Sequence, residues 1–298
     1  MSAASPERTM ERLRAALRHQ YRAIFPQSGM WQYNRLPLIS ETLPFLLLWS
    51  QKAASTVVLK WFFLKAGLLE EALRYNSFVH VFETEIFKKR PSYAHAVKKA
   101  LENDGLPVLK FVRDPAARAF SSYLFLNRPL LYSLTDDPAF YWRRRALQYA
   151  RGANAPVDSI FSFTEFLSWL NEEARPDIDG HLAPQYTKIE EQLGTRLQIY
   201  RAEMLDEAIA EIETRFALPR TSHEELNAIR ESKHHRPKDP RADTLERIIN
   251  EGLPNPATTR LRLPEFDTAT MQAYPKVKAL ISAYFADDYR AYGYKLDE

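Results

Sequence analysis

The order of apolar and polar residues along the chain predicts an α/β fold with a central parallel sheet flanked by helices. The segment at 43–49 has the length and apolar content of a strand buried on both faces, and further strands are predicted at 106–115 and 196–205. Segments with helical periodicity lie between and after them, and we expect helices at 55–66, 94–103, 116–126, 137–150, 164–174, 205–216 and 271–291. Strands that alternate with helices are typical of parallel sheets. The run FVHVFET at 78–84 is a candidate for one more strand.

The alternation fails in two stretches, 231–243 and 251–266, which are rich in proline and charge. We therefore predict mobile loops across 231–266. The first stretch contains a basic run, formed by Lys233, His234, His235, Arg236 and Lys238. Such a run is usually solvated, but beside a binding site it could cap a nucleotide or meet an anionic acceptor.

Residues 1–30 are predicted to contain a basic amphipathic helix. Its apolar face is formed by Met10, Leu13, Leu17, Tyr21 and Ile24, and arginines occupy much of the rest. Such a helix packs on a core or on the second subunit of a homodimer more often than on a membrane, so we do not expect membrane contact. The stretch lacks the apolar region of a signal peptide, and no apolar run is long enough to span a bilayer.

The composition fits one compact domain covering residues 1–298, because 45% of the residues are hydrophobic and 27% are charged. The 41 basic and 38 acidic side chains leave a net charge of +3, which does not imply nucleic-acid binding. The chain has no cysteine, which excludes disulfides, zinc–thiolate sites, iron–sulfur clusters and thiol nucleophiles. This composition fits a reducing compartment, and we expect a cytoplasmic protein.

The loop after the first predicted strand has the composition of an anion-binding site. A strand that ends in a tight loop and continues into a helix directs backbone N–H groups and the positive end of the helix dipole at one point. Lys52 adds a full positive charge there, and Ser55 and Thr56 add hydroxyl donors. The alternative is an ordinary helix start on the surface, with Ser55 or Thr56 near its cap.

The spacing in this loop differs from that of nucleotide-hydrolysing P-loops. Those loops place glycines at the turn and a lysine directly before the hydroxyl residue. Here Ala53 and Ala54 separate Lys52 from Ser55, and the first glycine after the strand is Gly67. The spacing therefore argues against ATP hydrolysis.

A second candidate anion site follows the second predicted strand. Arg113 stands at the end of that strand, a helix is expected to begin at or just after Pro115, and Arg118, Ser121 and Ser122 follow along it. A guanidinium at the strand end and a hydroxyl along the helix can clamp a phosphate, because arginine presents a planar fork of donors. Two anion sites on neighbouring strand ends suit a ligand with phosphates at two positions.

Four blocks of the sequence carry a family resemblance. QKAAST at 51–56, together with VRDPAARAFSSY at 112–123, resembles the paired 5′-phosphosulfate and 3′-phosphate motifs of sulfotransferases that use 3′-phosphoadenosine 5′-phosphosulfate (PAPS). DGHLAPQYTKI, followed by LQIYRAEMLDEAIAEIETRFALP, is similar to a third block, in two parts, of the Golgi-type carbohydrate sulfotransferases. ISAYFADDYRAYGY resembles their closing block. The blocks occur in the same order over residues 44–294.

The resemblance implies a P-loop-like sulfotransferase fold and transfer of a sulfuryl group from PAPS to a hydroxyl, with a carbohydrate as the expected acceptor and no metal required. It assigns Lys52, Ala53, Ala54, Ser55 and Thr56 to the 5′-phosphosulfate, and Arg113 and Ser121 to the 3′-phosphate. Lys52 is expected to neutralise the leaving group. The chain departs from the family at Gln51, where proline is usual, and at Ala54, where glycine or another small residue is usual. It also lacks the cysteines, signal anchor and stem of the Golgi enzymes, so we expect a soluble, bacterial-type relative.

The proton acceptor for the attacking hydroxyl is predicted to be His181, because imidazole titrates near neutral pH and this histidine stands in a family-like block. His80, His95 and Glu203 are alternatives, and each of them could instead be structural or solvated. Two other functions stay open at this point. The first is a nucleotide kinase with a degenerate P-loop, and the second is a non-catalytic nucleotide-binding relative.

Overall fold

The computed structural model describes residues 36–128, 131, 138–173, 178–231, 242–253 and 263–296. The described residues form two compact units, a sheet unit and a helical unit. The sheet unit contains residues 36–113 and 187–231, and the helical unit contains the others. The helix predicted within residues 1–30 and the basic run at 233–238 lie outside the described residues.

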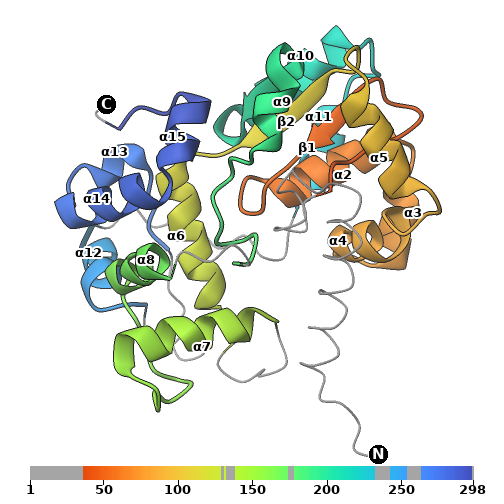
Figure 1. Ribbon diagram of the computed structural model, residues 1–298. Helices are drawn as coiled ribbons and strands as arrows, with labels where there is room; N and C mark the ends of the chain where they lie inside the picture. Colours follow the sequence, from red (N-terminus) through yellow and green to blue (C-terminus); the bar gives the residue numbers. More distant parts are fainter. Residues whose placement is uncertain are drawn as a thin grey trace, which may run out of the picture. The chain divides into compact units, whose positions relative to one another are not determined.

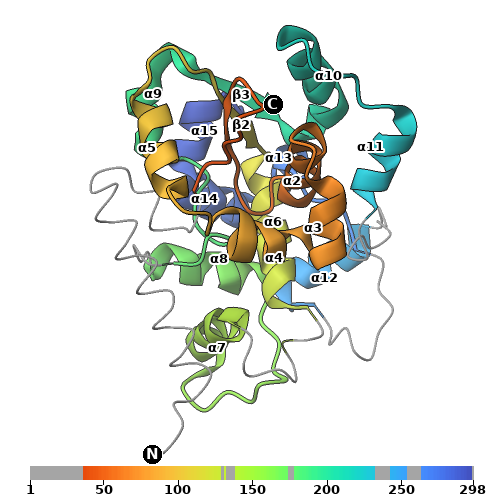
Figure 2. The ribbon, with the colours of Figure 1, turned by 90° about the vertical axis from the view of Figure 1, so that its right-hand side faces the viewer.

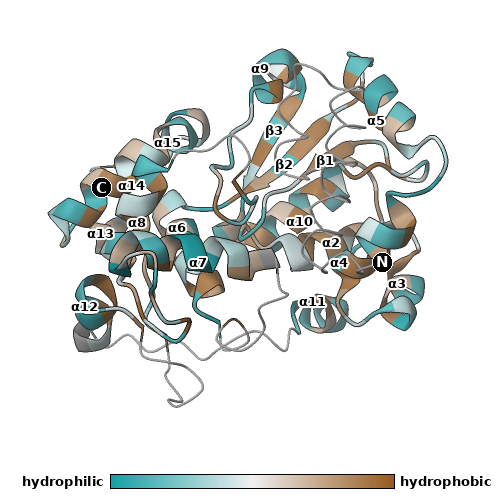
Figure 3. Cartoon of the chain, turned by 60° about the horizontal axis from the view of Figure 1, so that its bottom comes forward, coloured by the Kyte–Doolittle hydropathy of each residue, from teal (hydrophilic) through white to brown (hydrophobic). Residues whose placement is uncertain are grey.

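The centre of the sheet unit is a parallel sheet with the strand order β1 (Leu46–Leu48), β2 (Val108–Val112) and β3 (Leu197–Arg201). Leu46 pairs with Val108, which in turn pairs with Leu197. All residues of β1 and β2 are buried. Strand β2 is apolar except for Lys110, and it is mostly brown, the colour of hydrophobic residues, in Figure 3. A strand covered on both faces reads as a continuous apolar run. The parallel α/β prediction is confirmed.

Helix α2 (Ser55–Lys65) is the buried helix of this unit. Every side chain from Val57 to Phe63 is buried, so the helix is apolar on nearly all sides. It packs against α3 (Leu69–Tyr75), α4 (Val79–Phe82) and α11 (His223–Arg230), all labelled in Figure 1. The remaining helical segments of the unit are α5 (Tyr93–Glu102), α9 (Ile189–Leu193), η4 (Gly194–Arg196), η5 (Ala202–Met204) and α10 (Leu205–Arg215).

The strand predicted at 78–84 is wrong, because this segment is helical. Helix α4 continues directly into a π-helical turn, η2 (Glu83–Phe87). Phe82 and Phe87 both contact Phe63 of α2, with ring centroids 5.4 and 5.2 Å away. A spacing of five residues falls on one side of a π-helical turn, whose hydrogen bonds join residues five apart. Packing against α2 therefore overrides the strand propensity of the valine and phenylalanine residues.

The helical unit contains α6 (Pro115–Leu126), α7 (Pro138–Arg151), α8 (Phe163–Glu172), α12 (Ala242–Asn250), α13 (Thr268–Met271), α14 (Pro275–Tyr284) and α15 (Ala286–Tyr292). Helix α8 packs against α7, α12 and α14 (Figure 2). Two expectations need correction. Helix α12 lies inside the 231–266 stretch that was predicted as loops, and the helix expected over 271–291 is divided at Phe285 into α14 and α15.

The start of α6 follows from its sequence. Asp114 caps the helix, since its carboxylate accepts a hydrogen bond of 2.7 Å from the Ala117 N–H, and Pro115 occupies the first helical position. The carboxylate of Asp114 also accepts a hydrogen bond from the Thr268 N–H at the start of α13. One side chain thus fixes the starts of two helices.

A buried carboxylate fastens α2 to α10 within the sheet unit. Glu213 accepts a hydrogen bond of 3.0 Å from the Trp61 indole and forms an ion pair of 3.0 Å with Lys65. The N–H and the hydroxyl of Thr221 also donate to it. Burial alone would raise the pKa of Glu213, but the hydrogen bonds from Thr221, Trp61 and Lys65 outweigh it and hold the pKa below its ordinary value.

We expect Glu213→Gln to lower the free energy of unfolding at pH 7 by about 3 kcal/mol, because it leaves the ammonium of Lys65 buried without its partner charge. A carboxylate whose pKa is lowered by folding stabilises the protein above its unfolded pKa, and that stabilisation is lost as the pH falls through the folded pKa. The difference between variant and wild type should therefore shrink below about pH 4. Urea unfolding at several pH values measures this, with the exposed Glu207→Gln on the same helix as control. A pH-independent difference would contradict the expectation.

Candidate functional site

The loop between β1 and α2 is shaped by two left-handed residues that are not glycine. Lys52 has a φ of 67° and Ala54 has a φ of 54°. Between them the side chain of Ala53 is completely buried, and its N–H donates to the carbonyl of Ser50. Left-handed backbone is costly for residues with a Cβ atom and persists only where the surroundings determine it. The chain adopts the tight turn expected of this loop without any glycine.

The first turn of α2 presents hydrogen-bond donors at the end of this loop. The N–H groups of Val57 and Val58 both donate to the carbonyl of Ala54. Across the described ranges, the N–H groups of Ser55 and Thr56 have no acceptor. The first turn contains no acidic side chain. Two backbone donors, the positive end of the helix dipole and the nearby Lys52 form an environment that favours an anion.

Arg113 joins the second strand end to this loop. Its Nη1 donates a hydrogen bond of 3.2 Å to the carbonyl oxygen of Lys52. The two residues lie 61 positions apart in the sequence and meet because β1 and β2 are neighbours in the sheet. The carboxyl ends of neighbouring parallel strands are where such sheets bind ligands. Within the sheet unit, the structure thus brings Arg113 to the loop that contains Lys52.

The sheet unit also places His80 at this loop. His80 Nε2 lies 3.2 Å from the Thr56 hydroxyl, and His80 Nδ1 lies 2.8 Å from a carboxylate oxygen of Glu83. The other oxygen of Glu83 lies 2.6 Å from the Lys88 ammonium. The sequence favoured His181 as the base, with His80 only as an alternative. The signal for this pair was the spacing of three residues between His80 and Glu83, which brings the two side chains together on a helix but not on a strand.

The helical unit contains two of the predicted site residues, Ser121 and His181. Ser121 is half-buried on α6. His181 binds Asp179 through its backbone N–H at 2.8 Å and through Nδ1 at 2.6 Å, and its ring stacks on Phe125 with a centroid distance of 4.0 Å. The remaining alternatives, His95 on α5 and Glu203 in η5, are exposed residues of the sheet unit.

Arg118 and Ser122 hold the loop around His181 against α6. The fully buried Arg118 donates a hydrogen bond of 3.0 Å to the carbonyl of Gly180. The Ser122 hydroxyl lies 2.9 Å from the carbonyl oxygen of Arg118 and 2.5 Å from that of His181, and it can donate its one proton to either of them. These contacts are with the protein backbone, and they fix the loop around His181 to α6.

The last two resemblance blocks meet through the fully buried Asp288. Its carboxylate accepts hydrogen bonds from the backbone N–H groups of Gln185 and Tyr186, at 2.9 and 2.7 Å. A carboxylate buried with backbone donors satisfies its charge inside the protein. Within the helical unit, Asp288 therefore gives structural support to the backbone at Gln185 and Tyr186.

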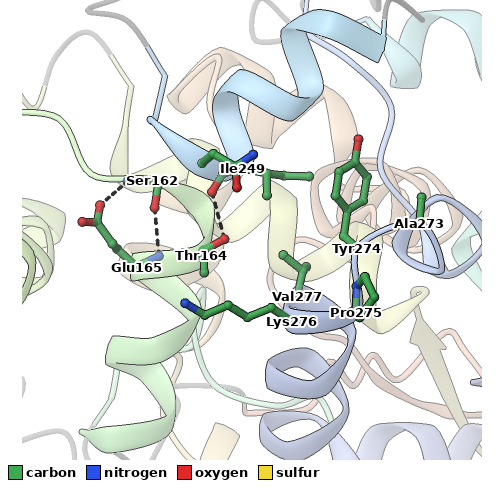
Figure 4. Close-up of a pocket in the computed structure, with 10 residues that line it drawn as sticks. Ser162, Thr164, Glu165, Ile249, Ala273, Tyr274, Pro275, Lys276 and Val277 are labelled. Carbon is green, nitrogen blue, oxygen red and sulfur yellow. Dashed lines mark hydrogen bonds between the residues drawn. The ribbon is translucent and has the colours of Figure 1, made fainter.

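The helical unit has an open pocket of about 370 Å³ at the start of α8, the end of α12 and the start of α14. Figure 4 shows Tyr274 and Lys276 along one part of it, and Ser162 and Glu165 in the capping interaction that begins α8. None of the site residues predicted from the sequence lines this pocket.

Within the described ranges, no three His, Asp or Glu side chains converge in a way that would hold a metal ion. No helix in the same part of the chain has the length and apolar content needed to cross a membrane.

Comparison with known proteins gives a family and no individual relative. The match to the sulfotransferase family covers residues 38–295, which includes both anion-binding segments and the closing block. No curated protein and no solved structure matches the chain significantly. The match decides for sulfuryl transfer over the nucleotide-kinase and non-catalytic interpretations. The chain belongs to the sulfotransferase family, whose members transfer a sulfuryl group from PAPS to an acceptor.

Proposed function

We propose that this sulfotransferase transfers the sulfuryl group of PAPS to a hydroxyl of a carbohydrate acceptor. The observation that carries the proposal is the left-handed loop from Lys52 to Ala54, which leads into the donors of α2 and is held by Arg113. The carbohydrate acceptor rests on the similarity of the later sequence blocks to Golgi-type carbohydrate sulfotransferases.

Lys52, Ser55 and Thr56 are proposed to hold the 5′-phosphosulfate. In an in-line displacement, the acceptor oxygen attacks sulfur while the bond from sulfur to the bridging phosphate oxygen breaks. Negative charge grows on that phosphate, and the Lys52 ammonium can stabilise it more strongly in the transition state than before reaction. The backbone donors of Ser55 and Thr56 and the small side chains of Ala53 and Ala54 allow a phosphate to approach the loop closely.

Arg113 and Ser121 are proposed to hold the 3′-phosphate. One nitrogen of the guanidinium contacts the Lys52 carbonyl. The planar fork of donors in a guanidinium matches the oxygens of a phosphate. Arg113 thus has two proposed roles, one in the shape of the loop and one in the recognition of the nucleotide.

Two histidines backed by carboxylates are candidates for the proton acceptor. The sequence blocks favour His181, which is paired with Asp179. A specific contact favours His80, because its Nε2 lies beside the hydroxyl of Thr56 in the proposed phosphosulfate loop. We propose His80 on this ground and retain His181 as the prediction from sequence.

The nucleotide can be tested by binding. Adenosine 3′,5′-bisphosphate should stabilise the protein by about 2.7 kcal/mol at 100 times its dissociation constant, whereas ATP with magnesium should not. Arg113→Ala should weaken the binding of this nucleotide by about 2 to 4 kcal/mol. It should weaken the binding of adenosine 5′-phosphosulfate, which lacks the 3′-phosphate, much less. Calorimetry measures both, with the exposed Arg74→Ala as control. An equal loss for both ligands would mean that Arg113 acts through the Lys52 carbonyl alone.

Lys52→Ala should lower turnover by roughly 10²- to 10³-fold, equivalent to about 3 to 4 kcal/mol of barrier, while adenosine 3′,5′-bisphosphate still binds. The reason is that the ammonium acts mainly on charge that develops during reaction. Single-turnover assays with PAPS and a carbohydrate acceptor measure this, and the exposed Lys99→Ala is the control. Unchanged turnover in Lys52→Ala would remove this lysine from the mechanism.

Alanine variants of the two histidines show which of them is the proton acceptor. Replacement of the histidine that accepts the proton should lower kcat roughly 10²- to 10⁴-fold. The free energy of nucleotide binding should change by no more than about 0.5 kcal/mol. We expect this pattern for His80→Ala. If it occurs in His181→Ala and not in His80→Ala, the sequence prediction holds and our assignment of His80 is wrong.

A further inference from the structure

The buried surroundings of His80 form a connected cluster in the sheet unit. Glu83 binds both His80 and Lys88, and the side chains of these three residues are 1%, 16% and 6% exposed, respectively. The His80 ring is packed by Trp49, with a centroid distance of 5.4 Å, and by Phe78, with a distance of 5.0 Å. The Lys88 ammonium also lies over the Trp49 ring. The imidazole is therefore held by contacts on several sides.

The charges of this cluster determine which nitrogen of His80 carries the proton. Burial alone would raise the pKa of Glu83, but the charge of Lys88 and the hydrogen bond from His80 outweigh it and keep the pKa below its ordinary value. An ionised carboxylate can only accept hydrogen bonds, so Nδ1 of His80 must be the donor. In the neutral imidazole Nε2 then has a free lone pair. The Thr56 hydroxyl, 3.2 Å away, donates to it.

The same hydroxyl is needed in the proposed phosphosulfate loop. A threonine hydroxyl has one proton, so it cannot donate to His80 and to a phosphate oxygen at the same time. If the phosphate takes this hydrogen bond, the lone pair of His80 Nε2 becomes available to another donor. The acceptor substrate brings such a donor in the hydroxyl that is to be sulfated.

We propose that Glu83 is a positioning residue that fixes His80 with Nε2 as the proton acceptor, and that Thr56 occupies this nitrogen until the 5′-phosphate of the nucleotide draws the hydroxyl away. This inference rests on the proposed function of the loop. Binding of the nucleotide would thus prepare the base for the acceptor and favour binding of PAPS first.

The acceptor oxygen forms a bond to sulfur, and its proton moves to Nε2 of His80. The bond from sulfur to the bridging oxygen breaks, and adenosine 3′,5′-bisphosphate leaves with its new charge near Lys52. The imidazolium formed on His80 lies beside the ionised Glu83, which stabilises it electrostatically.

The cluster contains a further buried hydrogen-bond donor, which suits an incoming oxygen atom. The indole nitrogen of Trp49 is buried and, in the part of the chain that the structure describes, has no hydrogen-bond partner. A buried donor left without an acceptor destabilises the protein, and such groups often mark a place where a ligand or water binds. Trp49 directly follows β1 and precedes the loop that contains Lys52.

Nuclear magnetic resonance tests the proton assignment directly. The full chain is labelled with ¹⁵N at histidine, and the His80 signals are assigned through His80→Gln. We expect the proton on Nδ1, and we expect saturating adenosine 3′,5′-bisphosphate to shift the Nε2 signal. Thr56→Val keeps the branched shape but has no hydroxyl, so the nucleotide should no longer produce this shift. A proton on Nε2 instead of Nδ1, or the same shift in Thr56→Val, would overturn the proposal.

The role of Glu83 is tested by kinetics. Glu83→Gln should lower kcat at least tenfold, since positioned proton acceptors contribute roughly 10²- to 10⁴-fold, while KM for PAPS stays within about twofold. The control is Glu85→Gln in the same turn, where the carboxylate is exposed and binds only the Tyr75 hydroxyl among the described residues. The double variant Glu83→Gln/Lys88→Met removes both charges. It avoids the destabilisation that a buried lysine without its partner would cause in the single variant, and the same loss of kcat is expected.

The outcomes separate this inference from the proposed function. If adenosine 3′,5′-bisphosphate gives no thermal stabilisation, the function proposed for the loop and this inference both fail. If it binds but kcat is unchanged in both Glu83 variants, only the positioning role of Glu83 is overturned.

Discussion

The hydrogen bond from Arg113 to the Lys52 carbonyl is the contact on which the proposed site depends. It connects the ends of β1 and β2 and holds a loop in which Lys52 and Ala54 have left-handed backbone. Such residues cost about 1–3 kcal/mol each, so the loop needs support from its surroundings. The shape of this loop decides where α2 begins, and the start of α2 decides where Thr56 meets His80. The proposed anion site and the proposed base therefore both depend on one local backbone geometry.

Buried charges in the sheet unit occur together with partners. Lys110, in the middle of β2, is 2% exposed and lies 2.5 Å from Glu190, whose carboxylate also accepts the Thr187 N–H. Glu83 is similarly enclosed between His80 and Lys88. Ion pairs of this kind add little net stability, but loss of one partner is costly because the other charge stays buried. These pairs thus constrain which side chains the core tolerates, and they fix the orientation of the groups they hold.

Strands β1 and β2 could be predicted from sequence, because strands buried on both faces are continuous apolar runs. The same rule failed at 78–84, where contacts of Phe82 and Phe87 with Phe63 make the segment helical. The places of Lys52 and Arg113 at strand ends could also be predicted. The contact between Thr56 and His80 could not, since it depends on how α4 packs against α2. Arg118 and Ser122 fitted an anion-binding pattern, yet they bind backbone carbonyls. A sequence pattern gives the type of a side chain but not the partner that it finds.

The absence of glycine from the loop also affects the unfolded chain. Alanine samples fewer backbone conformations than glycine, so ordering the loop loses less entropy, by about 0.4–1 kcal/mol for each such position. This gain offsets part of the strain of the left-handed conformation at Ala54. A loop of this kind is stiffer than a glycine-rich one before any ligand arrives. An anion that binds there has less backbone motion to suppress, so more of its interaction energy is retained as affinity.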